Sequence, residues 1–183
     1  EPFASADDRW RRHAASLLEL DGAAEGIAVA LGIGSGRLIE ELALRSKLHI
    51  IAVDPDAQRV DAFRRLMDAR GLYGTRVVAH VGDLRSFSLP PYLANLAFSE
   101  EFPSARVELT SDDVKRLFDP LRPYGGVLAI PTAENDHRAF AESVSQAKLH
   151  GAEVRRQGEL SLLTRVGALP GAVPQPTPAA AST

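Results

Sequence analysis

The chain's 183 residues are enough for one domain with a buried core, and its 45% hydrophobic and 25% charged residues are typical of a folded globular protein. The formal net charge of -3 lacks the basic excess of a nucleic-acid-binding protein, so a nucleic-acid partner is not expected. The absence of cysteine excludes disulfides, thiolate metal ligands and cysteine nucleophiles, no apolar run approaches the roughly 20 residues of a membrane helix, and we predict neither a metal site nor a membrane partner.

Apolar residues alternate along the chain between helical spacing and short buried runs. A first helix is predicted over residues 5–20, where Ser5 and Asp8 resemble a capping box. The predicted elements that follow are strands 27–31, 48–53, 76–81, 94–98 and 126–130, and helices 37–47, 57–70, 112–119 and 133–149. Strands separated by helices of this length indicate parallel βαβ units with right-handed crossovers.

The end of the chain departs from this alternation. Residues 152–157 and 159–166 read as two strands around Gly158, with no room for a helix between them. They predict a hairpin, so the α/β fold should be a seven-stranded sheet, mostly parallel with a C-terminal antiparallel hairpin and with helices on both faces. The domain should span residues 5–166, and residues 167–183, rich in Pro and Ala, should form a disordered linker or tail.

A glycine-rich turn follows the first predicted strand, with the sequence Gly32-Ile33-Gly34-Ser35-Gly36. In an open parallel sheet the ligand sits beyond the carboxyl ends of the strands, near the point where strand order reverses. Glycines at such a turn let a ligand approach without meeting a Cβ, and the amides of the following helix point toward it. The turn is therefore the first part of a predicted binding site.

The ends of the next strands carry polar residues. Asp54 ends the second strand 22 positions after Gly32, where a carboxylate accepts hydrogen bonds from ribose hydroxyls, and Pro55 follows it. At the end of the third strand, Asp83 can accept from an adenine amino group, with Leu84 flanking the ring. We also assign Asn95, on the fourth strand, to the site.

Each feature also has a purely local explanation. Glycine-rich turns close many βα units, Asp54 can cap the next helix through an Asx-type bond, and Asp83 can be a turn residue. The occurrence of three such features at three successive strand ends favours an adenosine-binding site over these local explanations.

The spacing of the glycines separates two kinds of adenosine ligand. The dinucleotide pattern needs a glycine at the sixth position of the turn, where this chain has Arg37, and its third glycine comes one residue early at Gly36. Such a turn suits the methionine end of S-adenosylmethionine better than a pyrophosphate. An NAD-dependent oxidoreductase is therefore the weaker alternative.

Residues 5–166 resemble the class I S-adenosylmethionine-dependent methyltransferases. The resemblance covers the glycine-rich turn, Asp54, the Gly82-Asp83 pair and residues 121–127, which look like the family's Leu-x-Pro-Gly-Gly turn with Tyr124 in place of a glycine. It implies a Rossmann-like fold, S-adenosyl-L-methionine as cofactor, and methyl transfer to an unknown small-molecule or protein acceptor.

A narrower resemblance concerns three segments, residues 71–77, 82–84 and 92–96. They look like the methyltransferase-like module fused to pyrroloquinoline-quinone-type β-propellers, and residues 169–172 resemble the point where such chains enter the propeller. This resemblance implies a multidomain protein with a fused β-propeller as partner. A propeller partner is compatible with a periplasmic or secreted location, whereas an active methyltransferase favours the cytoplasm, where its cofactor is made.

The chain departs from the methyltransferase family at two places. Ala30 stands where the family usually has an acidic residue two positions before the first glycine, and no Asn-Pro-Pro-Tyr motif is present. An in-line methyl transfer needs mainly positioning, and a base only where the nucleophile must lose a proton. The weak candidates for a base are Glu100, Glu101, Tyr92 and His137, each of which is also explained as a loop, surface or capping residue. A catalytically silent binding or scaffold module is therefore the alternative function.

Overall fold

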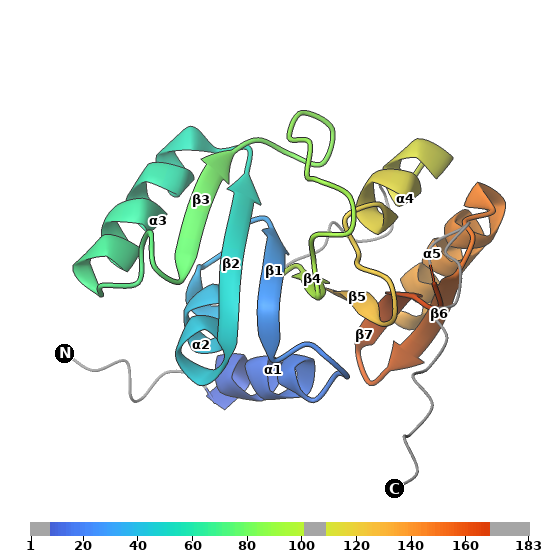
Figure 1. The fold of residues 1–183 in the computed structure, drawn as a ribbon, viewed down its shortest axis with the longest axis horizontal. Helices are drawn as coiled ribbons and strands as arrows, with labels where there is room; N and C mark the ends of the chain where they lie inside the picture. Colours follow the sequence, from blue (N-terminus) through green and yellow to red (C-terminus); the bar gives the residue numbers. More distant parts are fainter. Residues whose placement is uncertain (1–7, 101–108, 169–183) are drawn as a thin grey trace, which may run out of the picture.

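The computed structural model describes residues 8–100 and 109–168, which form a seven-stranded sheet flanked by helices (Figure 1). The strands are β1 (Glu25–Leu31), β2 (Lys47–Asp54), β3 (Val77–Val81), β4 (Leu96–Phe98), β5 (Gly126–Pro131), β6 (Ala152–Gln157) and β7 (Leu160–Arg165). The helices are α1 (Asp8–Leu18), α2 (Arg37–Arg45), α3 (Ala57–Ala69), α4 (Ser111–Phe118) and α5 (Glu134–Ala147).

The strand order across the sheet is β3-β2-β1-β4-β5-β7-β6. The first five strands are parallel, and β7 pairs antiparallel with both β5 and β6, as the hairpin pattern predicts. Strand order reverses between β1 and β4, which lie side by side with Ala30 opposite Phe98. The carboxyl ends of β1 and β4 therefore meet at the place where an open α/β sheet binds its ligand.

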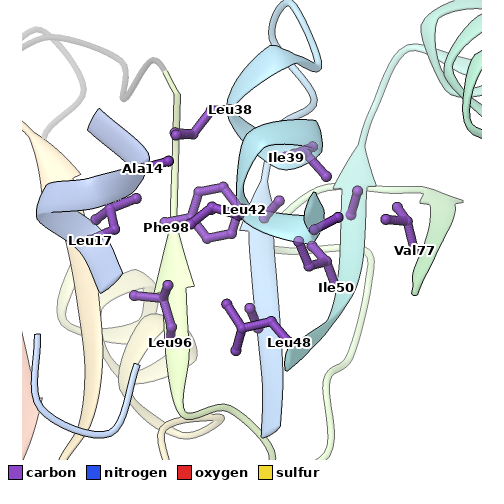
Figure 2. Packing of buried hydrophobic residues seen from close by; sticks show 14 of the residues in the cluster. Ala14, Leu17, Leu38, Ile39, Leu42, Leu48, Ile50, Val77, Leu96 and Phe98 are labelled. Atoms are coloured by element: carbon purple, nitrogen blue, oxygen red, sulfur yellow. The ribbon is translucent and has the colours of Figure 1, made fainter. Parts of the chain in front are cut away.

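One face of the sheet packs against α1, α2 and α3. Because side chains alternate along a strand, Ala28 and Ala30 of β1 point to this face and Val29 points to the other. Figure 2 shows the Phe98 ring among leucines of α1 and α2, and the ring is only 1% exposed. This face is a closed apolar core.

The other face packs against α4 and α5 over the β4, β5 and β7 side of the sheet. The connection between β3 and β4, residues 82–95, forms turns and no regular helix, so this crossover adds no helical layer (Figure 1). On β2 and β3 the side chains of this face stay partly open: Ile51 and Val78 are half-buried, and His80 is exposed. The two faces are therefore covered unequally.

Three predicted boundaries shift in ways that matter for the site. The strand β4 begins at Leu96 and not at residue 94, so the residues before it belong to the amino edge of the sheet. Helix α4 begins at Ser111, one residue before the predicted start, and is capped by Thr110, whose hydroxyl accepts from the Asp113 amide in a capping box. Helix α1 begins at Asp8, and the predicted cap Ser5 and the predicted tail from residue 169 onward lie outside the described residues.

Among the helices of the described segments, none combines the length and the apolar character needed to cross a bilayer.

Candidate functional site

The turn after β1 uses glycine for its backbone shape. Gly32, Gly34 and Gly36 have φ of +90°, +56° and +75°, in the left-handed region that side-chain-bearing residues rarely adopt. A Cβ on Gly34 would lie 2.9 Å from the Glu100 side chain, and a Cβ on Gly36 would lie 2.9 Å from the Phe63 ring. Glycine is thus required by the geometry of the turn, and Gly36 then caps α2 without a side chain.

Asp54, at the end of β2, is buried and fastens the glycine-rich turn to the start of α3. Its Oδ2 accepts from the Ile33 amide at 2.8 Å and its Oδ1 from the Asp56 amide at 2.9 Å. Arg59 Nη1 donates to both oxygens at 3.1 and 3.0 Å. Burial favours a higher pKa for the Asp54 carboxyl, but these hydrogen bonds outweigh it and hold the pKa below its ordinary value.

The contacts of Asp54 bear on its expected role. Each carboxylate oxygen already accepts two hydrogen bonds within the protein, which is about its full capacity. The residue therefore holds the turn in shape. A direct hydrogen bond from a ribose hydroxyl to Asp54 would require the Arg59 guanidinium to move away from the carboxylate.

Asp83, after β3, lies exposed at the start of the 82–95 connection. Its Oδ1 accepts from the amides of Arg85 and Ser86 and from the Ser86 hydroxyl at 2.9, 2.7 and 2.7 Å. These bonds, led by that of the Ser86 hydroxyl, hold the pKa of the Asp83 carboxyl below its ordinary value. Oδ1 is thus the acceptor in all the described hydrogen bonds of this carboxylate.

A bidentate ion pair joins the connection after Asp83 to α4. Arg85 Nε and Nη2 each donate to one oxygen of Asp113 at 2.9 Å, and the Thr110 hydroxyl donates to Oδ2 at 2.8 Å. The Arg85 guanidinium, followed by the Thr110 hydroxyl, holds the pKa of Asp113 far below its usual range. Two segments distant in sequence therefore enclose a space between them.

That space is a cavity of about 710 Å³, within the range of small-molecule sites. It extends from the carboxyl ends of β1, β2 and β3 along α4. The part at the strand ends is lined by Leu31, Gly32, Gly34, Val53, Asp54, Pro55, Arg59, Asp83, Leu84 and Ser99. The part along the connection and α4 is lined by Arg85, Phe87, Ser88, Leu89, Leu109, Asp113, Arg116, Leu117, Asp119 and Pro120.

The first part of the cavity contains most of the predicted cofactor residues. Gly32, Gly34, Asp54, Pro55, Asp83 and Leu84 line it. Ile33, Ser35 and Gly36 belong to the same turn, where the first two donate backbone amides to Asp54 and Glu100. The sequence gives no comparable signal for the second part, because its wall exists only where α4 packs across the 82–95 connection.

Asn95 does not lie at this site. It precedes β4, and its side chain accepts from the Ile27 amide at 3.3 Å and donates to the Gly22 carbonyl at 3.3 Å. Both partners belong to the amino edge of the sheet, opposite the cavity. Asn95 is therefore not brought together with the other predicted cofactor residues, because it precedes β4 and the cavity lies at the carboxyl ends of the strands.

Tyr92 also lies at the amino edge. Its amide donates to the Asp119 carbonyl at 3.0 Å, and the guanidinium of Arg165 stacks over its ring at 5.0 Å. The same guanidinium lies 3.7 Å from the Phe118 ring and donates to the Phe118 carbonyl at 2.9 Å. Tyr92 is therefore part of a packing cluster and not a base at the cavity.

His137 belongs to a polar cluster that joins α5 to β7. Its Nδ1 lies 2.7 Å from the hydroxyl of the fully buried Ser161, which in turn lies 2.5 Å from the Thr132 hydroxyl. None of these three residues lines the described cavity. Of the remaining base candidates, Glu101 lies outside the described residues, and Glu100 lies directly beneath the glycine-rich turn.

Glu100 follows β4 by two residues and is 7% exposed. Its Oε1 accepts from the Ser35 amide at 2.9 Å. Its Oε2 is buried and has no hydrogen-bond partner among the residues that the structure describes. The carboxyl thus supports the turn with one oxygen and leaves the other without a donor.

The fold is shared with solved methyltransferase structures. A protein of Methanococcus maripaludis, provisionally named an S-adenosyl-L-methionine-dependent methyltransferase, matches with a TM-score of 0.74 at 14% identity, over 90% of this chain and 87% of that one. A geranyl diphosphate methyltransferase, solved with S-adenosylmethionine, matches with a TM-score of 0.66 at 15% identity, over 85% of both chains. The fold class predicted from the sequence is confirmed.

One similar structure carries a different activity in its name. The [4+2]-cyclase SpnF matches with a TM-score of 0.62 at 18% identity, over 80% of this chain and 59% of that one, so this chain spans under two thirds of SpnF. No protein-family model and no curated protein matches the chain in sequence. At these identities the comparisons show the fold. The activity has to be inferred from the chemistry of the site.

Proposed function

We propose that this chain binds S-adenosyl-L-methionine at the strand-end part of the cavity and acts as a methyltransferase. The observation that carries the proposal is the glycine-rich turn, whose three left-handed glycines keep Cβ atoms off the surface where a ligand would lie. Asp83 supports the proposal because the three described hydrogen bonds of its turn all use Oδ1, which leaves Oδ2 to accept from an adenine amino group. Asp54 supports it indirectly by fixing the Ile33 amide.

The part of the cavity along α4 fits an acceptor molecule. Its walls combine the apolar side chains of Phe87, Leu89, Leu117 and Pro120 with polar and charged ones, among them the Arg85–Asp113 pair. Such a surface favours a small acceptor that has an apolar body and a polar group, because the apolar side chains remove apolar area from water and the charged ones can pair with the polar group. The bound cofactor supplies an already activated methyl group, so the residues of this part act by orienting the acceptor and excluding water.

Titration calorimetry with S-adenosylhomocysteine tests the cofactor proposal. Asp83→Asn keeps an oxygen that accepts from the Arg85 and Ser86 amides, but replaces the other oxygen with an amide donor. We expect the affinity to fall about tenfold, the value of one hydrogen bond to a charged group. Asp61→Asn, an exposed acidic residue of α3 that pairs with Arg64, is the matched control and should leave the affinity unchanged. Absence of binding by the unaltered chain at millimolar ligand would refute the proposal, and tight NADH binding would favour the oxidoreductase.

A catalytically silent binding module is the second candidate. It is favoured by the placement of Tyr92 and His137 away from the cavity, and by Ala30 in place of an acidic residue. Incubation with labelled S-adenosylmethionine and a panel of small apolar nucleophiles separates the two candidates. Methyl transfer that is lost in Gly34→Val would exclude the silent module. The fused β-propeller and the cellular compartment stay predictions from the sequence, which the similar structures do not address.

A further inference from the structure

We propose that the acceptor of this chain is a small carboxylate with an apolar body, and that Arg116 of α4 pairs with its carboxylate group. The inference rests on the proposed function and names the class of molecule that binds in the α4 part of the cavity. Arg116 then selects the acceptor by its charge, and the apolar side chains of the same wall receive the rest of the molecule.

Arg116 differs from the other two arginines that line the cavity in having no acidic partner. Arg59 pairs with Asp54, and Arg85 forms the bidentate pair with Asp113. In the part of the chain that the structure describes, no carboxylate lies within ion-pair distance of the Arg116 guanidinium. Its N–H donors are therefore available to a ligand in the cavity.

The two aspartates in the α4 part of the cavity are each balanced by another arginine. Asp113 accepts from Arg85. Asp119 is attracted to the buried guanidinium of Arg165, which donates to the carbonyl of the residue before Asp119 at 2.9 Å. Three arginines, Arg116 included, thus face two aspartates, and this part of the cavity has one positive charge in excess.

The charge and shape of this wall favour a carboxylate. A carboxylate carries one negative charge, whereas a phosphate monoester carries nearly two at neutral pH and would leave the excess uncompensated. The planar guanidinium also matches the two oxygens of a carboxylate. Because the same wall includes Phe87, Leu89 and Leu117, the rest of the ligand should be apolar.

Arg116 also has a purely local explanation, which its neighbour on the helix controls for. Lys115 and Arg116 both lie in the last turn of α4, where a cation favours the carbonyl end of the helix. Both side chains are exposed, but Lys115 is not among the residues that line the described cavity. Arg116→Gln and Lys115→Gln therefore remove the same charge from the same turn and differ in their position relative to the cavity.

Matched carboxylate and amide probes test the inference. Phenylacetate and octanoate carry the charge, and phenylacetamide and octanamide keep the same apolar bodies without it. Their affinities are measured by calorimetry, with saturating S-adenosylhomocysteine and again without it. We expect the unaltered chain to bind at least one carboxylate about fivefold to tenfold more tightly than its amide. Arg116→Gln should abolish this preference, and Lys115→Gln should retain it.

Four results would overturn the inference. They are equal affinities of the unaltered chain for carboxylates and amides, binding of none of the four probes at millimolar concentration, a preference that survives Arg116→Gln, and an equal loss in Lys115→Gln. Phenyl phosphate that binds more tightly than phenylacetate would contradict the charge balance and overturn it as well.

The proposed function fails separately from this inference. The affinity for S-adenosylhomocysteine should be the same in the unaltered chain and in both variants. Absence of S-adenosylhomocysteine binding by the unaltered chain would refute the proposed function, whatever the carboxylates do. Binding of S-adenosylhomocysteine without a carboxylate preference would leave the proposed function standing and refute the acceptor class.

Discussion

The two faces of this sheet are built from the same strands and differ in what their crossovers contribute. On one face α1, α2 and α3 cover the strands and enclose Phe98 and its apolar neighbours. On the other, α4 and α5 cover the β4, β5 and β7 side, and the 82–95 connection crosses without a helix. The closed face supplies stability, and the cavity forms where the second face lacks a helical layer. A cavity can thus arise where a crossover has no helix.

The largest effect should come from the closed face. Phe98→Ala removes a ring that is 1% exposed, and we expect it to lower the free energy of unfolding by about 3–5 kcal/mol, because the helices can fill the space only in part. Denaturant unfolding followed by circular dichroism measures this change. Leu44→Ala is the control, because the Leu44 side chain on α2 is 63% exposed. It should change the free energy of unfolding by less than about 0.5 kcal/mol. A loss under about 1 kcal/mol for Phe98→Ala would show that the face is loosely packed.

Neighbouring isoleucines of β2 compare the faces directly. Ile50 points to the closed face and is 1% exposed, whereas Ile51 points to the open face and is half-buried. We expect Ile50→Ala to cost about 2 kcal/mol more than Ile51→Ala in the same unfolding experiment, since only the first leaves an enclosed cavity. Equal losses would mean that something covers Ile51 as fully as the helices cover Ile50.

The ion pair between Arg85 and Asp113 should give a smaller, pH-dependent effect. Asp113→Asn weakens the closure of the cavity wall, and we expect a loss of about 1 kcal/mol at neutral pH because Arg85 is largely exposed. The pKa of Asp113 is lowered in the folded chain, so its contribution is present above the ordinary carboxyl pKa of about 4 and is lost as the pH falls below it. The melting temperature of the variant should therefore decline less steeply with acid than that of the unaltered chain. Parallel acid profiles would contradict this assignment.

Most of the fold could be predicted because its signals are local. Short apolar runs, helical spacing and the tight turn at Gly158 locate the strands, the helices and the antiparallel hairpin. The start of β4 could not be predicted. Ala94 and Asn95 are compatible with a strand, and only their hydrogen-bond partners in the folded chain decide whether they belong to it. The Ala94 backbone forms an isolated bridge with Leu121, and the Asn95 side chain is held by Ile27 and Gly22. Asn95 and Tyr92 lie at the amino end of β4, whereas the cavity lies at the carboxyl ends of the strands.

The sequence by itself determined the backbone of the turns. Gly32, Gly34 and Gly36 adopt left-handed conformations that glycine alone accepts freely. These are short-range steric properties of the chain. Three contacts were decided by the tertiary structure alone. Glu100 accepts a hydrogen bond from the Ser35 amide, Arg59 donates to the Asp54 carboxylate, and Arg85 pairs with Asp113 at the cavity wall. Such contacts depend on which strand lies beside which, because each joins side chains to partners that only the packed sheet brings within hydrogen-bonding distance.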